Sequence, residues 1–358
     1  MSANRILAIN PGSTSTKIAV YNNTSVELIR TIRHSSEELE GYDKVTDQFA
    51  FRKELIINEL KDADIRIESL GVIIGRGGLV KPIPSGVYEV NDQMKADLID
   101  SPLGEHASNL GGLIADDIAN SLDKDVKAYI VDPVVVDEME DVARYAGHPL
   151  FERLSIFHAL NQKATARIHA ESMDQEYEDL NLIVVHLGGG ISVGAHRRGQ
   201  VIDVNNALDG EGPFSPERSG TLPAGQLVKL CLSDKYTYRE LKEILKGKGG
   251  LVAYLKTNEA YQVEIDAREG NTESKAVQDA MCYQVGKAIG EMSAVLCGEV
   301  DSIILTGGIA HNNYLVEYIT RMVGFIAPVA VYPGEDEMRA LAMNGLRVLK
   351  GQLQAKIY

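Results

Sequence analysis

Two small-residue turns in this sequence carry the residue types that bind phosphate groups. Residues 10–17 read Asn-Pro-Gly-Ser-Thr-Ser-Thr-Lys, a turn that offers backbone N–H groups, hydroxyls and the point charge of Lys17 to an anion. Residues 188–190 are three glycines after an apolar run, and they cost conformational entropy unless something must approach the backbone closely. Phosphate binding explains both turns, with a hydroxyl-rich hairpin and a tight sheet bend as the alternatives.

A third glycine segment lies late in the chain. Gly307 and Gly308 follow an apolar run and precede Asn312 and Asn313, either of which suits the N-cap of a helix. A strand that ends in this way is typical of a nucleotide site at the carboxyl edge of a sheet, and also of plain strand–helix packing. Neither G-x-x-x-x-G-K-[ST] nor G-x-G-x-x-G occurs, so these segments form no Walker A loop and no dinucleotide fingerprint.

Four further residues could take part in phosphoryl chemistry. Arg76 and Arg218 lie in glycine-containing loops, where a guanidinium is suited to bidentate binding of phosphoryl oxygens. His158 begins a predicted helix, a position at which a lone histidine is more commonly structural. Asp132 ends a predicted buried strand and fits either a residue that orients Mg²⁺ or a polar anchor.

The elements that must position these residues follow a pattern that occurs twice. A strand at 5–10, a turn and a strand at 17–21 lead to a third strand near Val26, and residues 182–206 repeat this strand–turn–strand–turn–strand plan. The repeat predicts an α/β protein with a duplicated fold, in which two related lobes face each other across a cleft. Further strands are predicted at 72–74, 128–131 and 302–305, and helices at 105–122, 156–171, 223–232, 237–246, 273–298, 311–323 and 335–354.

These elements divide into three segments. We expect an N-terminal α/β lobe over residues 1–150, a C-terminal nucleotide-binding lobe over 151–334, and a C-terminal helix in 335–358 that packs back on the first lobe. The helix at 273–298 has the clearest apolar periodicity, which suits either the core or an interface between subunits.

Composition excludes several classes of function. The net charge of −15 argues against non-specific nucleic-acid binding, whereas a nucleotide pocket needs only a few local donors. Three cysteines without C-x-x-C spacing make neither a disulfide framework nor a zinc site, and they are expected to be buried thiols. Without a signal-peptide core or an apolar run of about 18 residues, the sequence predicts a cytoplasmic protein that does not bind membranes.

Several of these segments, taken in order, resemble the acetate and sugar kinase, heat-shock chaperone and actin superfamily, and within it the acetate kinase family. The resemblance covers the whole chain. Its motifs are N-P-G-S-T-S-T-K at 10–17, G-R-G-G at 75–78, V-D-P-V-V-V-D-E at 131–138, F-H at 157–158, H-L-G-G-G at 186–190, P-E-R-S-G-T-L-P at 216–223, T-G-G-I-A-H-N at 306–312 and E-D-E-M-R-A-L-A at 335–342.

The resemblance implies two ribonuclease H-like α/β lobes with mixed sheets and an ATP cleft, with ATP and Mg²⁺ as cofactors. Carried over by the motifs, the residues around the ATP phosphates, the adenosine and the metal are Asn10, Ser13, Ser15, Lys17, His186, Gly188, Gly189, Gly190, Gly307, Gly308 and Asn312. Asn10 and Glu337 are the implied metal residues, and Glu337 and Asp132 would orient Mg²⁺ or the acceptor. Arg76 and Arg218 would clamp the phosphoryl group and the substrate carboxylate, and His158 would donate to the transition state.

Two positions depart from the acetate kinase pattern. Gly189 replaces an Asn in the middle of the glycine turn, and Thr221 replaces an acidic residue after R-S-G. Both features, with the segment at 131–138, are similar to butyrate kinases. The implied function is ATP-dependent, reversible phosphorylation of butyrate or a related short-chain or branched-chain carboxylate by a homo-oligomer. The alternatives are an acetate or propionate kinase, and a non-kinase ATP-switched protein of the same superfamily.

Overall fold

The computed structural model describes residues 4–358 of the chain and divides into two compact units. The first unit runs to Val136 and includes Asp336–Tyr358, and the second comprises Asp137–Glu335. The division thus falls before the expected position near residue 150. The boundary is earlier because the segment after Val136 packs with the second unit, where the Glu138 carboxylate accepts from Lys163 Nζ at 2.7 Å.

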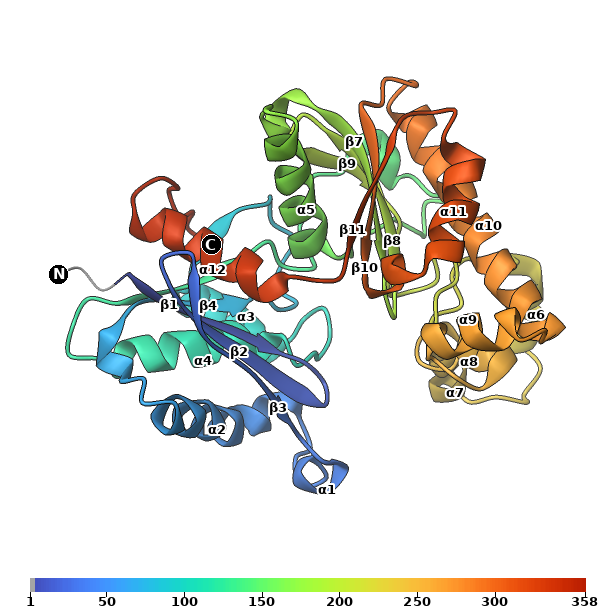
Figure 1. Cartoon of the computed structure of the whole chain (residues 1–358). Coiled ribbons are helices and arrows are strands. Elements are labelled where there is room, and N and C mark those ends of the chain that lie inside the picture. Colours follow the sequence, from blue (N-terminus) through green and yellow to red (C-terminus); the bar gives the residue numbers. More distant parts are fainter. Residues whose placement is uncertain (1–3) are drawn as a thin grey trace. The chain divides into compact units, whose positions relative to one another are not determined.

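The first unit is built on a six-stranded mixed sheet (Figure 1). Its strand order is β3-β2-β1-β4-β6-β5, in which the first three strands are antiparallel neighbours and β1, β4 and β6 are parallel. The strands are β1 (Arg5–Pro11), β2 (Ser15–Asn22), β3 (Ser25–Arg33), β4 (Leu70–Arg76), β5 (Val87–Glu89) and β6 (Lys127–Val131). The carboxyl ends of three adjacent parallel strands therefore meet at one sheet edge, where ligands bind in open α/β sheets.

Alternate residues of the central strands bury opposite faces of this sheet. Leu7 and Ile9 of β1 join a core with α2 (Phe49–Asp62) and α4 (Asn109–Asn120). Ile6 faces α12 (Glu337–Leu349), whose Gly345 lies against it. In Figure 1, α12 and α4 flank opposite faces of the sheet. The C-terminal helix is thus part of the first unit's core. The unit also contains α1 (Ser36–Leu39) and α3 (Asp92–Asp100).

The second unit repeats the topology with a five-stranded sheet. Its order is β11-β10-β7-β8-β9, with β7, β8 and β9 antiparallel and β7, β10 and β11 parallel. The strands are β7 (Asn181–Leu187), β8 (Ile191–Arg197), β9 (Gln200–Val204), β10 (Ser302–Gly307) and β11 (Val329–Pro333). The correspondence β3-β2-β1-β4 with β9-β8-β7-β10 confirms the predicted duplicated fold of two mixed α/β sheets.

Helices cover both faces of this second sheet. Leu182 and Val184 pack with α5 (Ala159–Ser172), while Ile183 and Val185 pack with the helices of the other face. Those helices are α10 (Thr272–Val295) and α11 (Asn313–Val323). Four short helices precede them: α6 (Ala224–Cys231), α7 (Tyr238–Leu245), α8 (Gly250–Leu255) and α9 (Ala260–Arg268).

The structure corrects several details of the sequence prediction. The predicted helices all exist, but each is shorter than expected; the last ends at Leu349, not at residue 354. Of the three cysteines only Cys282 is buried, whereas Cys231 and Cys297 are exposed, because they lie at helix ends. Within residues 4–358, no helix has the length and apolar character needed to cross a membrane.

Candidate active site

Three residues from distant parts of the sequence form a polar cluster in the first unit. Asn10 Nδ2 donates to Glu337 Oε2 at 2.6 Å, and Arg76 Nη1 donates to the same oxygen at 3.2 Å. Arg76 Nη1 also lies 3.3 Å from Asn10 Oδ1. Asn10 and Glu337 are buried, and Arg76 is mostly buried. The structure thus brings the Arg76 guanidinium together with Asn10 and Glu337, the two residues that the resemblance implied for the metal.

The fold places this cluster at the carboxyl edge of the sheet. Asn10 is near the end of β1, and Arg76 ends the parallel neighbour β4, one step beyond the pair Ile9 and Gly75. Glu337 is the first residue of α12, where a carboxylate interacts favourably with the helix dipole. A side chain at Gly75 would overlap the backbone of Gly111 on α4, so the glycine lets that helix lie directly against the strand end.

The turn after β1 presents the hydroxyl residues predicted to bind phosphate. Gly12 N–H donates to Ser15 O at 2.7 Å and closes the turn, and Ser13 and Lys17 are exposed. Ser15 is half-buried. The turn is therefore ordered by the chain itself while its hydroxyls remain accessible.

Asp132 serves as a polar anchor in the structure. It is buried directly after β6, adopts a left-handed backbone with φ of 34°, and its Oδ1 accepts from Gly86 N–H at 2.7 Å. Its own N–H donates to Gly86 O at 3.1 Å. These two bonds hold the loop that follows Arg76 against the end of β6. A role for Asp132 toward Mg²⁺ stays a prediction.

In the second unit, the glycine turn lies at the corresponding sheet edge. His186 near the end of β7 pairs with Thr306 of the parallel strand β10, so residues 188–190 and Gly307 follow neighbouring strand ends. A pocket of about 400 Å³ opens there. Its lining includes Gly188, Gly189, Gly308 and Asn312, all four of which the sequence had assigned to nucleotide binding.

Gly189 and Gly190 of this turn are glycines for different structural reasons. A side chain at Gly190 would overlap the Arg218 guanidinium, whose Nη1 donates to Ala207 O. Burial lowers the pKa of Arg218 below its usual value. At Gly189, by contrast, a Cβ would meet only Glu217 Oε2, at 3.7 Å. Gly190 is therefore required for packing, whereas the space at Gly189 belongs to the pocket.

The glycines after β10 differ in the same way. Gly307 has φ of 92° and packs on the backbone of Leu187, so its conformation and its contact both require glycine. Gly308 has open space where its Cβ would be. Asn312 is the N-cap of α11 and accepts from Leu315 N–H at 2.9 Å, which confirms the predicted helix start.

A buried chain of hydrogen bonds orients His158, the N-cap residue of α5. Gln162 Nε2 donates to both the carbonyl and Oγ of Ser192, at 3.1 and 2.8 Å. A carbonyl can only accept, so this contact fixes the amide orientation, and Gln162 Oε1 accepts from His196 Nε2 at 2.9 Å. Burial, Lys163 and Arg167 keep the pKa of His196 well below its usual value, so it stays neutral.

The chain of hydrogen bonds continues through Ser192 to the ring of His158. Ser192 is fully buried, and its Oγ lies 2.9 Å from His158 Nδ1. Oγ accepts from Gln162 Nε2, and an arrangement in which its own proton is donated to Nδ1 leaves the ring proton of a neutral His158 on Nε2. In this arrangement His158 is an Nε2–H hydrogen-bond donor.

His158 also stacks on His186, with ring centroids 3.8 Å apart and planes 10° from parallel. His186 Nδ1 lies 2.7 Å from Asn161 Oδ1, and its Nε2 lies 3.2 Å from Glu335 Oε1. Glu335 in turn lines the pocket beside Gly188. The two histidines are therefore held as a rigid pair next to the glycine turn.

The sequence analysis missed the residues that support this site. Asn161 and Gln162 lie three and four positions after His158, so they share its helix face. That spacing could have revealed them. Glu335 begins the motif at 335–342 but received no role, because only the fold brings the segment after the second unit's last strand to the glycine turn.

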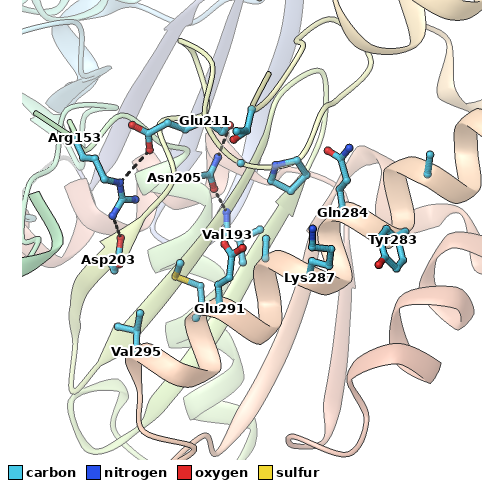
Figure 2. Close-up of a pocket in the computed structure, with 16 residues that line it drawn as sticks. Arg153, Val193, Asp203, Asn205, Glu211, Tyr283, Gln284, Lys287, Glu291 and Val295 are labelled. Carbon is cyan, nitrogen blue, oxygen red and sulfur yellow. Dashed lines mark hydrogen bonds and ion pairs between the residues drawn. The ribbon is translucent and has the colours of Figure 1, made fainter. Parts of the chain in front are cut away.

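A second, larger pocket of about 730 Å³ lies in the second unit between α10 and the sheet (Figure 2). Figure 2 shows Arg153 bridging Asp203 at 3.0 Å and Glu211 at 3.4 Å, with Lys287 on the facing helix. The Arg153 guanidinium is thus neutralised by two carboxylates and is not available to bind a phosphate. Thr221, a departure from the acetate kinase pattern, lines this pocket and not that of Gly189.

The predicted catalytic residues divide between the two units. Arg76 and Asp132 belong to the first unit, and His158 and Arg218 belong to the second. Within each unit they lie at or beside the carboxyl ends of the parallel strands or next to the glycine turn. The residues 4–358 contain no cluster of three or more His, Cys, Asp or Glu side chains able to hold a metal ion.

Comparison with known proteins identifies the family. A model of the acetokinase family matches residues 150–327. Over 99% of this chain and of each relative, the sequence is 58% identical to butyrate kinase 2 of Clostridium acetobutylicum and 53% identical to a probable butyrate kinase of Bacteroides thetaiotaomicron.

Solved structures show the same fold. Acetate kinase of Porphyromonas gingivalis superposes with a TM-score of 0.78 at 18% identity, covering 96% of this chain and 99% of that one. A propionate kinase of Francisella tularensis gives a TM-score of 0.73 at the same identity and coverage. Since its full-length relatives share more than half of its residues, the chain belongs to the acetokinase family.

Proposed function

We propose that this protein is a butyrate kinase, which transfers the γ-phosphoryl group of ATP reversibly to butyrate or a related short-chain carboxylate. Membership of the acetokinase family makes it a carboxylate kinase. The observation that carries the substrate assignment is the 58% identity to a butyrate kinase over 99% of both chains. By contrast, the solved acetate and propionate kinases share only the fold at 18% identity.

The acceptor needs no general base. A short carboxylic acid is ionised at neutral pH, so catalysis depends on positioning and on stabilisation of the phosphoryl charge. In this proposal Arg76 and Arg218 bind phosphoryl and carboxylate oxygens, and His158 donates its Nε2–H. The glycine-lined pocket beside Gly189 and Gly308 receives the nucleotide.

The residues of the first unit fit a Mg²⁺ ion of the kind that accompanies ATP. Mg²⁺ is bound in such sites by one or two carboxylates, substrate phosphates and water, so no dedicated cage of three protein ligands is needed. Asn10 Nδ2 donates to Glu337 Oε2 at 2.6 Å, and Arg76 Nη1 donates to the same oxygen at 3.2 Å. Glu337 Oε1 and Asn10 would hold the ion, which supplies positive charge to the β- and γ-phosphates.

The test is a hydroxylamine-trapping assay of acyl phosphate with acetate, propionate, butyrate, isobutyrate and valerate. The proposal predicts the highest kcat/KM for butyrate or isobutyrate, with weaker activity on propionate, because one methylene in an apolar pocket changes binding by about 1–3 kcal/mol. The highest kcat/KM with acetate would identify an acetate kinase. Tight ATP binding without acyl phosphate from any acid would indicate an ATP-switched protein.

A further inference from the structure

The turn after β1, residues 12–15, is proposed to bind phosphate. A buried guanidinium that the proposed mechanism does not use contacts its carbonyl groups. Arg52 of α2 is fully buried, and within residues 4–358 no carboxylate forms an ion pair with it. An unpaired buried charge is costly, so its retention calls for a reason.

The guanidinium binds the carbonyl side of the turn. Nη1 donates to Gly12 O at 2.8 Å and lies 3.2 Å from Ser15 O, while Nη2 donates to Ser13 O at 3.1 Å. The carbonyl of the remaining residue, Thr14, accepts from His34 N–H at 2.9 Å. Four consecutive carbonyls are thus engaged on the protein side. Since the C=O and N–H of a trans peptide point in opposite directions, this arrangement turns peptide N–H groups toward the other side.

The charge of Arg52 persists in this environment. Burial lowers its pKa to about 10, so the group remains a cation at neutral pH. Gln48 Oε1 accepts from Nε at 3.0 Å and from Nη2 at 2.8 Å, and Thr16 Oγ1 lies 3.0 Å from Nη1. The charge is therefore solvated by neutral groups alone. His34, beside Thr16, has its pKa lowered by burial and by Arg52, and adds no second charge.

We infer that Arg52 is a positioning residue for nucleotide binding: it shapes the turn and supplies the positive charge that a bound polyphosphate compensates. The inference rests on the proposed function, which places phosphates at this turn. It predicts that neutralising Arg52 weakens binding of ATP but not of adenosine, which lacks phosphates.

The sharpest test is Gln48→Glu. This isosteric change puts a carboxylate where the Gln48 amide oxygen already accepts from Arg52. The Arg52 guanidinium and the turn therefore keep their geometry, while the net positive charge behind the turn is neutralised. Isothermal titration should show ATP binding weakened by about fivefold to tenfold, a change that corresponds to one charge felt at short range. Adenosine affinity should stay within about twofold, and the thermal midpoint should not fall.

Three further variants separate charge from shape. Arg52→Gln removes the charge and should weaken ATP binding at least as much as Gln48→Glu, and Arg52→Lys should restore part of that loss. Lys53→Gln is the matched control, since it removes a cation of the same helix that pairs with Asp117 away from the turn.

Unchanged ATP affinity in Gln48→Glu, or equal losses for ATP and adenosine, would overturn the inference. A wild-type protein that binds ATP no more tightly than adenosine would overturn the phosphate assignment of the proposed function, and the inference with it.

Discussion

At the scale of single residues, the site depends on side chains whose protons and charges are fixed by their neighbours. Glu337 accepts from both Asn10 and Arg76, which joins the ends of two strands to the start of α12. Ser192 holds the ring of His158, and Gly190 makes room for Arg218. Each functional group is thus held by a partner from another element, an arrangement that favours preorganised electrostatic catalysis.

Loss of either arginine should lower turnover more than stability. Arg76→Ala and Arg218→Ala are each expected to reduce kcat by at least about a hundredfold, because an arginine at a phosphoryl transition state contributes about 10³–10⁵ in rate. Steady-state kinetics with ATP and butyrate measure this. Arg5→Ala is the control, since Arg5 pairs with Glu27 at the opposite end of β1. Near-normal kcat in both active-site variants would remove the assignment.

The proton of His158 provides a test that does not depend on activity. ¹⁵N-labelled histidine NMR, with His158→Gln for assignment, should place the proton of the neutral ring on Nε2. Ser192→Ala should shift the population toward Nδ1–H, because the hydroxyl that donates to Nδ1 in the proposed arrangement is then absent. Ser274→Ala, another buried serine of the second unit, should leave the signal unchanged. A proton on Nδ1 in the wild type would contradict the proposed arrangement of protons between Ser192 and His158.

At the scale of elements, close approach between backbone segments decides where the site residues lie. Helix α4 contacts β4 through Gly75 and Gly111, and the strand ends at Arg76 beside this contact. The sequence predicted both elements, but not α2, because its buried stripe at Arg52, Ile56 and Leu60 begins with a charged residue. The half-buried edge strand β11 was missed although its residues Val329–Pro333 are apolar, and prolines at 328 and 333 flank this run.

Two glycine-to-alanine changes test this packing. A Cβ at Gly111 would overlap the backbone of Arg76, so Gly111→Ala should destabilise the protein by about 1–3 kcal/mol or more. Gly290 in α10 has open space around its Cβ, and Gly290→Ala should stabilise by up to about 1 kcal/mol through helix propensity. Urea denaturation measures both. Equal effects of the two variants would show that α4 does not need this contact.

The hydrogen bond between Gln162 of α5 and His196 of β8 should make the free energy of unfolding depend on pH. His196 has a folded pKa well below its unfolded value of about 6.5, owing to burial and to the neighbouring cations Lys163 and Arg167. The unfolded state therefore binds the proton first, and stability present above pH 6.5 falls as the pH drops below it, by up to about 1.4 kcal/mol per pH unit. Denaturation midpoints at pH 7.5 and 5.5 should differ less in His196→Gln than in the wild type. His148→Gln, which removes an exposed histidine, should leave the difference unchanged.

At the scale of the whole molecule, a duplicated topology gives each unit its own carboxyl edge and its own group of candidate site residues. The repeat was visible in the sequence from residue 5 to near Val26 and over 182–206, because each copy ends its first strand in a small-residue turn; in the structure it spans 5–33 and 181–204. The grouping of Glu337 with Asn10 was not derivable from spacing, since 327 residues separate them. Local pattern thus predicts the strands and turns, whereas contacts between distant segments require the fold.

The central claim is phosphoryl transfer between ATP and butyrate, and the reverse reaction tests it most directly. ADP, Mg²⁺ and butyryl phosphate are mixed with the protein, and ATP formation is followed by luciferase luminescence. The account predicts ATP in amounts that match the butyryl phosphate consumed, with higher kcat/KM for butyryl phosphate than for acetyl phosphate. Release of inorganic phosphate without ATP, or a preference for acetyl phosphate, would contradict it.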